Sequence, residues 1–180
     1  MSSHEGCRGD SCVVAAGDHL YVCGGCLEHD DLVTKAAERF NTVENKWEAI
    51  ADMQQERARA FGVAMEGKIF LAGGCFEETV KTCEMYIIST NEWQLIGSLT
   101  IDHFDGSMVC LKGKLYVLGG TDVFGDSRLS VECYDPIEDK WIEKTTIPAV
   151  KMISKLDKYY AFTGCVLNLS QGVLDKLDVI

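Results

Sequence analysis

The sequence predicts an all-β fold built from about three four-stranded antiparallel units, and two repeated features carry that prediction. A Gly-Gly pair ends an apolar run three times, at Gly24-Gly25, Gly73-Gly74 and Gly119-Gly120. An aromatic residue follows each pair, and a Trp follows seven positions later, which gives the couples Phe40 and Trp47, Tyr86 and Trp93, Tyr134 and Trp141. Repetition at intervals of 49 and 46 residues between Gly-Gly pairs indicates repeated supersecondary units.

Each unit is predicted to contain four short strands, which the second unit illustrates with the ranges 60–65, 68–73, 81–87 and 92–96. The first two strands are joined by a two-residue hairpin containing Gly, at Gly17-Asp18, Glu66-Gly67 and Lys112-Gly113. Turn-forming residues separate the last two strands, such as Asn91 in the second unit. The second strand is continuously apolar, which is typical of a strand buried on both faces.

One such sheet has two faces to cover and little core of its own, so the units need their neighbours. Radial stacking of the sheets into a β-propeller covers both faces. Large aromatic rings on the outer strands are expected to fill the widening space between blades, and the Gly-Gly pairs to lie where backbones approach closely. Since a propeller closes with four to eight blades, three units predict part of a ring, which favours self-association through its open edges.

The combination of an apolar run, Gly-Gly, a loop, an aromatic residue and Trp resembles the Kelch repeat over roughly residues 11–143. The sequence most resembles the Kelch-like (BTB–BACK–Kelch) adaptors in the segments 113–120, 131–136 and 139–141. The first two units depart from the usual Tyr-Asp, with Phe40-Asn41 and Tyr86-Ile87. We therefore divide the chain into a polar N-terminal segment, three Kelch repeats, and a partial blade or tail: 1–10, 11–50, 51–97, 98–143 and 144–180.

The resemblance implies a non-catalytic protein-interaction module that recognises the substrate of a cullin-3 ubiquitin ligase. In that family the cullin contact lies in a BTB domain and the adjoining BACK region, so these repeats are expected to bind the substrate and not cullin-3 itself. A second hypothesis is a Kelch module that binds actin filaments. A third, less favoured, is a propeller enzyme such as the Kelch-type copper oxidase, whose site needs several His, Tyr and Cys ligands around the ring.

Composition and charge argue against several other kinds of partner and site. A net charge of −11 disfavours nucleic acid and anionic membranes as partners, since both would be repelled. Nine cysteines without a recognisable secretion signal favour reduced thiols and a cytoplasmic location. Cys23 and Cys26 have a C-x-x-C spacing with His29 nearby, which leaves metal or redox use open, but no second pair completes a zinc site. We expect no cofactor and no metal.

The order of the strands predicts which end of the propeller binds a partner. In an antiparallel meander the tight hairpins emerge at one end of every blade and the long, variable loops at the other. Function concentrates on loops held by a rigid scaffold, so we expect the loop end to bind a protein with a basic or mixed-charge segment. Phe104 and Phe124 are candidate apolar anchors. The full set of predicted contact residues is Glu28, Asp30, Asp31, Arg57, Glu77, Glu78, His103, Phe104, Asp122, Phe124 and Asp126. A solvated acidic rim is the alternative interpretation of the acids.

Overall fold

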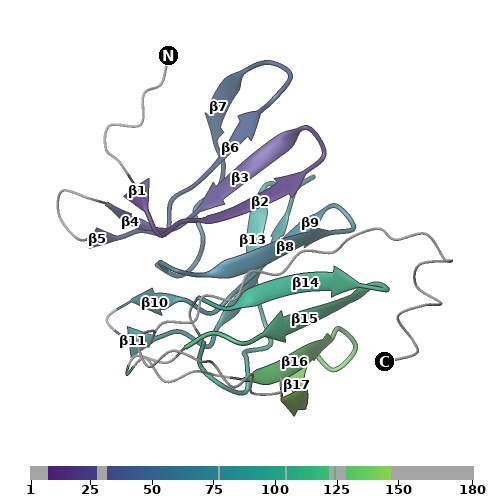
Figure 1. The fold of residues 1–180 in the computed structure, drawn as a ribbon. Helices are drawn as coiled ribbons and strands as arrows, with labels where there is room; N and C mark the ends of the chain where they lie inside the picture. Colours follow the sequence, from purple (N-terminus) through teal and green to yellow (C-terminus); the bar gives the residue numbers. More distant parts are fainter. Residues whose placement is uncertain are drawn as a thin grey trace, which may run out of the picture.

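The computed structural model describes residues 8–27, 32–76, 78–103, 105–121, 124 and 129–146. Every regular element among these residues is a β-strand, which confirms the predicted all-β class. Three four-stranded antiparallel sheets lie one after another along the chain, fanned like the blades of a propeller (Figure 1). The predicted partial blade or tail lies, from residue 147 onward, outside the described residues.

The three blades share one strand order, in which each strand pairs with the next one along the chain. The first blade contains β2 (Cys12–Ala16), β3 (His19–Cys23), β6 (Ala37–Asn41) and β7 (Lys46–Ala49). The second contains β8 (Phe61–Met65), β9 (Lys68–Ala72), β12 (Cys83–Ile87) and β13 (Glu92–Ile96). The third contains β14 (Ser107–Leu111), β15 (Lys114–Leu118), β16 (Ser130–Asp135) and β17 (Lys140–Thr146).

The first strand of each blade is the inner one, because β8 contacts both β2 and β14. Shorter strands lie in the loops at one end of the blades. They are β1 (Arg8–Gly9), β4 (Cys26–Leu27) and β5 (Leu32–Val33) by the first blade, and β10 (Cys75–Phe76) and β11 (Glu78–Thr79) by the second. No helix in the described part of the chain is long and apolar enough to cross a membrane.

The third strand of the second blade begins at Cys83, two residues later than predicted. The carbonyls of Lys81 and Thr82 instead accept hydrogen bonds from outside the sheet. Leu99 N donates to Lys81 and Arg57 Nη1 donates to Thr82, both at 2.9 Å. The fourth strand has the predicted bounds.

The turns adopt the backbone conformations that their residues predict. Both hairpin residues have positive φ in two of the blades, at Glu66-Gly67 (51° and 72°) and Lys112-Gly113 (52° and 71°), as a two-residue hairpin requires. At the other turn of each blade, a left-handed Asn or Asp stands two residues before the Trp: Asn45, Asn91 and Asp139. These short polar side chains tolerate positive φ better than most others.

The core lies between the blades rather than within them. Between the first two blades it is formed from one side by Cys12, Val14, Tyr21 and Cys23 and from the other by Ile69, Leu71, Tyr86 and Trp93. Between the second and third blades it contains Phe61, Phe70 and Ala72 facing Leu115, Val117, Tyr134 and Trp141. The aromatic couples pack ring against ring at 5.0–5.3 Å between centroids. The prediction that these rings fill the space between blades is confirmed for the second and third couples, whereas Trp47 is 43% exposed.

Candidate protein-interaction site

The Gly-Gly pairs form the junction between consecutive blades. Gly25 N donates a hydrogen bond to the carbonyl of Arg57, and Gly74 N donates to the carbonyl of His103, both at 2.9 Å. A Cβ atom on Gly24 would lie 2.2 Å from the Arg57 carbonyl oxygen, and the first Gly of each pair also has positive φ (64° at Gly24). A side chain is therefore excluded by both space and backbone conformation. We call the contact of one blade with the next, including this junction, a seam.

Arg57 is fully buried in the first seam, which contradicts its predicted role as a surface contact. Its Nη1 donates to the carbonyls of Gly73 and Thr82, both at 2.9 Å, and its Nη2 donates to Thr82 Oγ1 at 3.0 Å and to Glu84 Oε1 at 2.8 Å. The Glu84 carboxylate also accepts from the backbone of Gln54 and Gln55. A buried guanidinium with a buried carboxylate partner can hold the seam together but cannot reach a partner protein.

His103 occupies the corresponding place in the second seam and is also fully buried, so its predicted partner-binding role is wrong for the same reason. Its Nδ1 donates to the Gly119 carbonyl at 2.7 Å, since a carbonyl oxygen can only accept. Its Nε2 lies 3.2 Å from Glu132 Oε1 and 3.3 Å from Ser130 Oγ.

Glu132 is held as a carboxylate by its surroundings. Burial alone would raise its pKa, but hydrogen bonds from His103 and from the backbone and hydroxyl of Thr100 outweigh burial, and the pKa is lowered. The Ile101 amide adds a further hydrogen bond at 3.3 Å. The second seam thus keeps a negative charge in a place that is shielded from water.

The first blade carries the same pair, with Arg8 and Glu38. Arg8 Nη2 lies 3.8 Å from Glu38 Oε2, and Arg8 Nη1 donates to the Ala36 carbonyl at 3.3 Å. In all three blades the Arg or His of the pair stands four residues before the inner strand, and the Glu stands two residues before the repeated aromatic residue. The repeated Glu is visible in the sequence at Glu38, Glu84 and Glu132, although none of the three is among the predicted site residues.

A second set of equivalent residues links the blades at the centre of the loop end. Asp10, Arg59 and Asp105 each have left-handed φ, at 55°, 56° and 53°. Arg59 N donates to the Asp10 carbonyl at 2.7 Å, and Asp105 N donates to the Arg59 carbonyl at 3.2 Å. The Arg59 guanidinium pairs with the Asp105 carboxylate, and both side chains are about one third exposed. These residues present charge to solvent beside the loops predicted to bind a partner.

Among the other predicted contact residues, the structure places Phe124 in the open, with 87% of its surface exposed. Glu78 lies in β11, at the loop end of the second blade. The remaining predicted contacts lie outside the described residues: Glu28, Asp30, Asp31, Glu77, Phe104, Asp122 and Asp126. Their role in binding stays a prediction.

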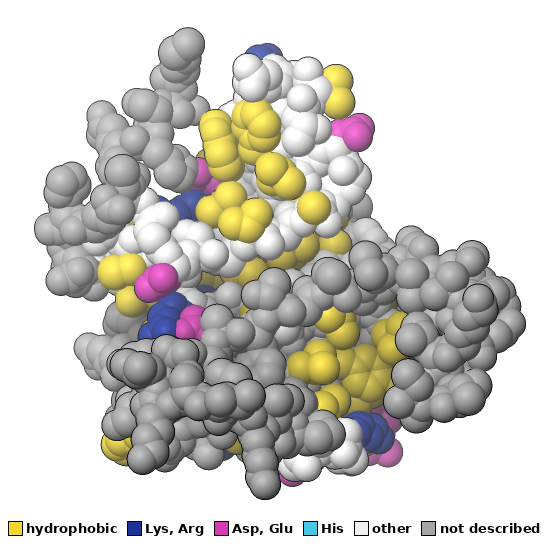
Figure 2. Space-filling model, in the orientation of Figure 1, with side chains coloured by type: hydrophobic (Ala, Val, Ile, Leu, Met, Phe, Trp, Pro, Cys, Tyr) yellow, Lys and Arg dark blue, Asp and Glu magenta, His cyan; other side chains and the backbone are white. Residues whose placement is uncertain are grey.

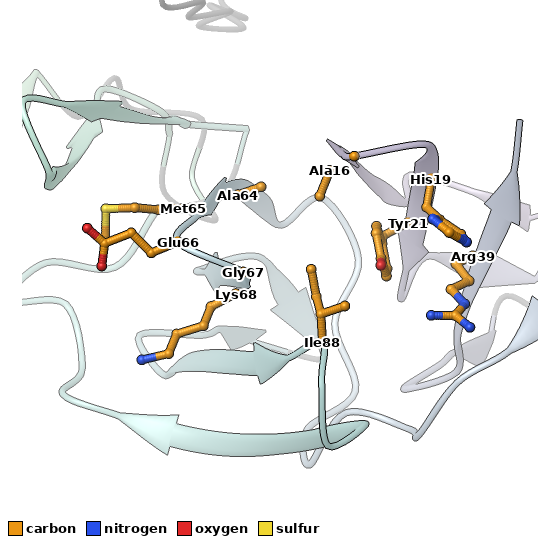
Figure 3. A pocket seen from close by; sticks show the side chains of 11 residues that line it. Ala16, His19, Tyr21, Arg39, Ala64, Met65, Glu66, Gly67, Lys68 and Ile88 are labelled. Atoms are coloured by element: carbon orange, nitrogen blue, oxygen red, sulfur yellow. The ribbon is translucent and has the colours of Figure 1, made fainter.

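The hairpin end is not smooth, although its connections are short. A pocket of about 440 Å³ opens there between the first two blades. His19, Tyr21 and Arg39 line one side, and Glu66 and Lys68 line the other (Figure 3). Arg39 is held by Glu48, with both Nε and Nη2 at 2.7 Å from Glu48 Oε2. The corresponding pocket between the second and third blades is smaller, at about 260 Å³.

The described cysteines are all free thiols: Cys12, Cys23, Cys26, Cys75, Cys83, Cys110 and Cys133. Burial raises the pKa of Cys12 and Cys83 to about 12, and it also raises the pKa of Cys23. Such thiols are unreactive at neutral pH and act as small apolar core residues. In the described part of the chain, no three His, Cys, Asp or Glu side chains are grouped so that they could hold a metal ion.

Four-stranded blades joined through buried seams, with loops gathered at one end, define a β-propeller. The sequence matches the family model of the Kelch motif over residues 7–54, 56–100 and 104–146, and the chain belongs to the Kelch-repeat family. Kelch repeats form protein-interaction modules, in general without catalytic activity.

Two similar proteins agree with this assignment. An F-box/kelch-repeat protein of Arabidopsis thaliana is 26% identical over 78 residues, which are 43% of this chain and 20% of that protein. The solved structure of YjhT superposes with a TM-score of 0.67 at 16% identity, over 78% of this chain and 52% of that chain. The match therefore spans a fifth of the curated relative and about half of the solved structure.

Proposed function

We propose that this chain recognises a protein substrate for a cullin-3 ubiquitin ligase, through the loop end of its Kelch blades. The observation that carries the proposal is the way the loops are held. The first two long loops start at Gly24-Gly25 and Gly73-Gly74, whose backbone is hydrogen-bonded to the segment that leads into the next blade. The buried Arg57–Glu84 and His103–Glu132 pairs lie at these junctions. A rigid base of this kind reduces the loss of conformational entropy when the loops bind a partner.

The chemistry of the loops indicates the partner. The loops after β3, β9 and β15 contain seven carboxylates: Glu28, Asp30, Asp31, Glu77, Glu78, Asp122 and Asp126. The exposed Phe124 ring stands in the third of these loops and suits an apolar anchor. A segment with Lys or Arg beside a large apolar side chain complements this surface, and acidic loops would steer it into place.

The link to the ligase rests on resemblance. The runs 113–120, 131–136 and 139–141 resemble the Kelch-like adaptors, in which a BTB domain contacts cullin-3. The name of the Arabidopsis relative likewise pairs Kelch repeats with an F-box. In the proposed role these repeats bind the substrate in the cytoplasm, and cullin-3 reaches the complex only through a BTB domain.

Affinity capture from cells, followed by mass spectrometry, tests the proposal. The tagged chain should enrich a set of proteins that is lost in the Glu77→Lys/Glu78→Lys variant. The matched control is Glu44→Lys/Glu138→Lys, which makes the same charge change on exposed turns at the hairpin end and should retain that set. Proteins lost equally in both variants, or in neither, would contradict recognition by the loop end.

The ligase step needs a second comparison. When the chain is fused to a BTB domain, captured proteins should gain ubiquitin and should lose it when cullin-3 is depleted. Capture that is sensitive to the loop variant without any cullin-dependent ubiquitin would retain the interaction role and reject the ligase role. Cosedimentation with actin filaments, unchanged by the loop variant, would favour the filament-binding alternative.

A further inference from the structure

The first blade has an exposed apolar face on the side away from the second blade. Its residues alternate with those of the core: Val13, Leu20 and Trp47 are 60%, 38% and 43% exposed, and Val22 and Phe40 are half-buried. Figure 2 shows hydrophobic side chains gathered over the part of the molecule where β2, β3, β6 and β7 lie. We call these five residues the leading face of the first blade.

The same face is covered in the other two blades. The residues at the positions of Leu20, Val22, Phe40 and Trp47 are Ile69, Leu71, Tyr86 and Trp93 in the second blade, and Leu115, Val117, Tyr134 and Trp141 in the third. All eight are buried against the preceding blade. The leading face of the first blade therefore has the pattern of a surface that packs against another blade of this kind.

The third blade offers the matching surface. On the first two blades, the trailing face that packs into a seam contains Val14, Tyr21, Cys23 and Ala37, and then Val63, Phe70, Ala72 and Cys83. The corresponding positions of the third blade hold Val109, Tyr116, Leu118 and Val131, all half-buried. This apolar set is the trailing face of the third blade.

The backbone at this face already has the conformation of a seam. Gly119 and Gly120 have φ of 60° and 111°, close to the 64° and 106° of Gly24 and Gly25. Gly119 N donates to the Ser130 carbonyl as Gly24 N donates to the Ala36 carbonyl. In the formed seams the second Gly then donates to the carbonyl of the buried Arg57 or His103, whereas for Gly120 N no acceptor is found among the described residues.

We infer that two copies of this chain join head to tail, the trailing face of each third blade packing on the leading face of the other copy's first blade. Two identical seams then close a ring of six blades with two-fold symmetry. In each new seam Gly120 N would donate to the Arg8 carbonyl, because Arg8 stands where Arg57 and His103 stand in the formed seams. The Tyr116 ring would meet the Phe40 ring, as Tyr21 meets Tyr86 at 6.0 Å in the first seam.

The choice of a second copy follows from size as well as from the faces. The superposed part of this chain takes up 52% of the YjhT chain, so a ring of that size needs about as much protein again. A second copy supplies that amount together with both matching faces. Six blades lie within the range of four to eight at which propellers close.

The mass of the purified chain in solution tests the inference. Light scattering should give twice the chain mass of 19.9 kDa. Leu20→Glu on the leading face and Val109→Glu on the trailing face should each weaken the dimer at least a hundredfold, because each substitution places a charge in both seams. Mixing the two variants should restore a dimer through the one seam that keeps native faces. Ile137→Glu, at a turn residue that is 92% exposed, is the control and should leave the dimer intact.

A photo-crosslinking side chain at Phe40 gives a second measurement, which keeps the native charges. Isotopically labelled and unlabelled chains should become joined, with position 40 linked to the peptide that contains Tyr116 of the other copy. A monomer, a link from position 40 to residues 147–180 of its own chain, or an open-ended polymer would overturn the closed dimer. A dimer that is indifferent to both face variants would overturn it as well.

Discussion

The two formed seams have the same backbone junction but different side chains, and this contrast shows which parts of a blade contact are fixed. In both seams the second Gly donates to the carbonyl of the residue whose side chain pairs with the buried Glu. The side chain that pairs with the Glu carboxylate is the guanidinium of Arg57 in the first seam and the imidazole of His103 in the second. The backbone of the junction is thus constant, while the side chain that pairs with the carboxylate varies.

The pockets at the hairpin end likewise share a position between the blades but differ in the side chains that line them. Tyr21 and Arg39 line the pocket of the first seam, whereas Phe70 and Met85 line that of the second. The first pocket is the larger, and it has a phenol and a guanidinium where the second has the Phe70 ring and the Met85 thioether, while Glu66 and Lys68 line both. The backbone therefore sets where a pocket forms, and substitutions between repeats change the side chains that line it.

The largest expected effect comes from removing the guanidinium of the first seam. Arg57→Met leaves Glu84 buried without its counter-charge and should lower the free energy of unfolding by about 3–5 kcal/mol. His103→Met should cost less, because Arg57 makes four hydrogen bonds and His103 makes fewer. Urea denaturation measures the free energy of unfolding of both variants. A larger loss for His103→Met would contradict the prediction that Arg57 stabilises its seam more than His103 does.

A methyl group at a junction glycine should come next. Gly24→Ala puts Cβ against the Arg57 carbonyl, and Gly73→Ala puts it 2.4 Å from the His103 carbonyl. Each should cost roughly 2–3 kcal/mol, from left-handed strain together with overpacking. Gly113→Ala is the control, since it has positive φ but no atom within 4 Å of the added methyl, and should cost about 1 kcal/mol. Equal losses at all three positions would show that only backbone strain matters at the seams.

Acid should weaken the second seam through Glu132. Because hydrogen bonds lower the pKa of Glu132 in the folded chain, its ionised form adds stability above the ordinary pKa of about 4.3, and this stability is lost as pH falls through the folded pKa. The stability difference between the wild type and Glu132→Gln should therefore be largest near neutral pH and shrink below about pH 4. Denaturation across that range measures it, and a difference that does not change with pH would contradict the role of the carboxylate.

The smallest effect is expected at the aromatic hydroxyls. Tyr134 OH donates to Asp139 Oδ1 at 2.6 Å, and that oxygen also accepts from Gly97 N. In the first seam Tyr86 OH donates to the neutral Asn91 at 2.9 Å. Tyr134→Phe should cost roughly 1 kcal/mol and Tyr86→Phe somewhat less, because the acceptor of Tyr134 is charged. Thermal denaturation compares them, and a larger loss for Tyr86→Phe would contradict this ranking.

The sequence predicted the features of the fold that depend on local spacing. Hairpins with Gly, the continuously apolar second strand and the couple of aromatic residue and Trp all act over a few residues, and their repetition identified the blades. The sequence also predicted the close approach of another backbone at Gly24 and Gly73, because only Gly combines such an approach with positive φ.

The candidate site was harder to predict because it depends on contacts between distant residues. Arg57 and His103 lie in polar loops by sequence, and their burial is explained only by Glu84 and Glu132, 27 and 29 residues further along the chain. A Glu repeated inside a buried strand was the available signal, since a buried carboxylate requires a partner. No local sequence pattern predicts the pocket beside Tyr21 and Arg39, because the pocket arises from the difference between two repeats.

A double-mutant cycle on Arg57 and Glu84 tests most directly whether a buried ion pair holds the blades together. The free energy of unfolding would be measured by urea denaturation for the wild type, Arg57→Met, Glu84→Met and the double variant. We predict that the double variant loses less than the sum of the single losses, with a coupling energy of about 2–3 kcal/mol. Additive losses, with coupling near zero, would show that the two residues stabilise the chain independently and would contradict the pair as the device that holds the first seam.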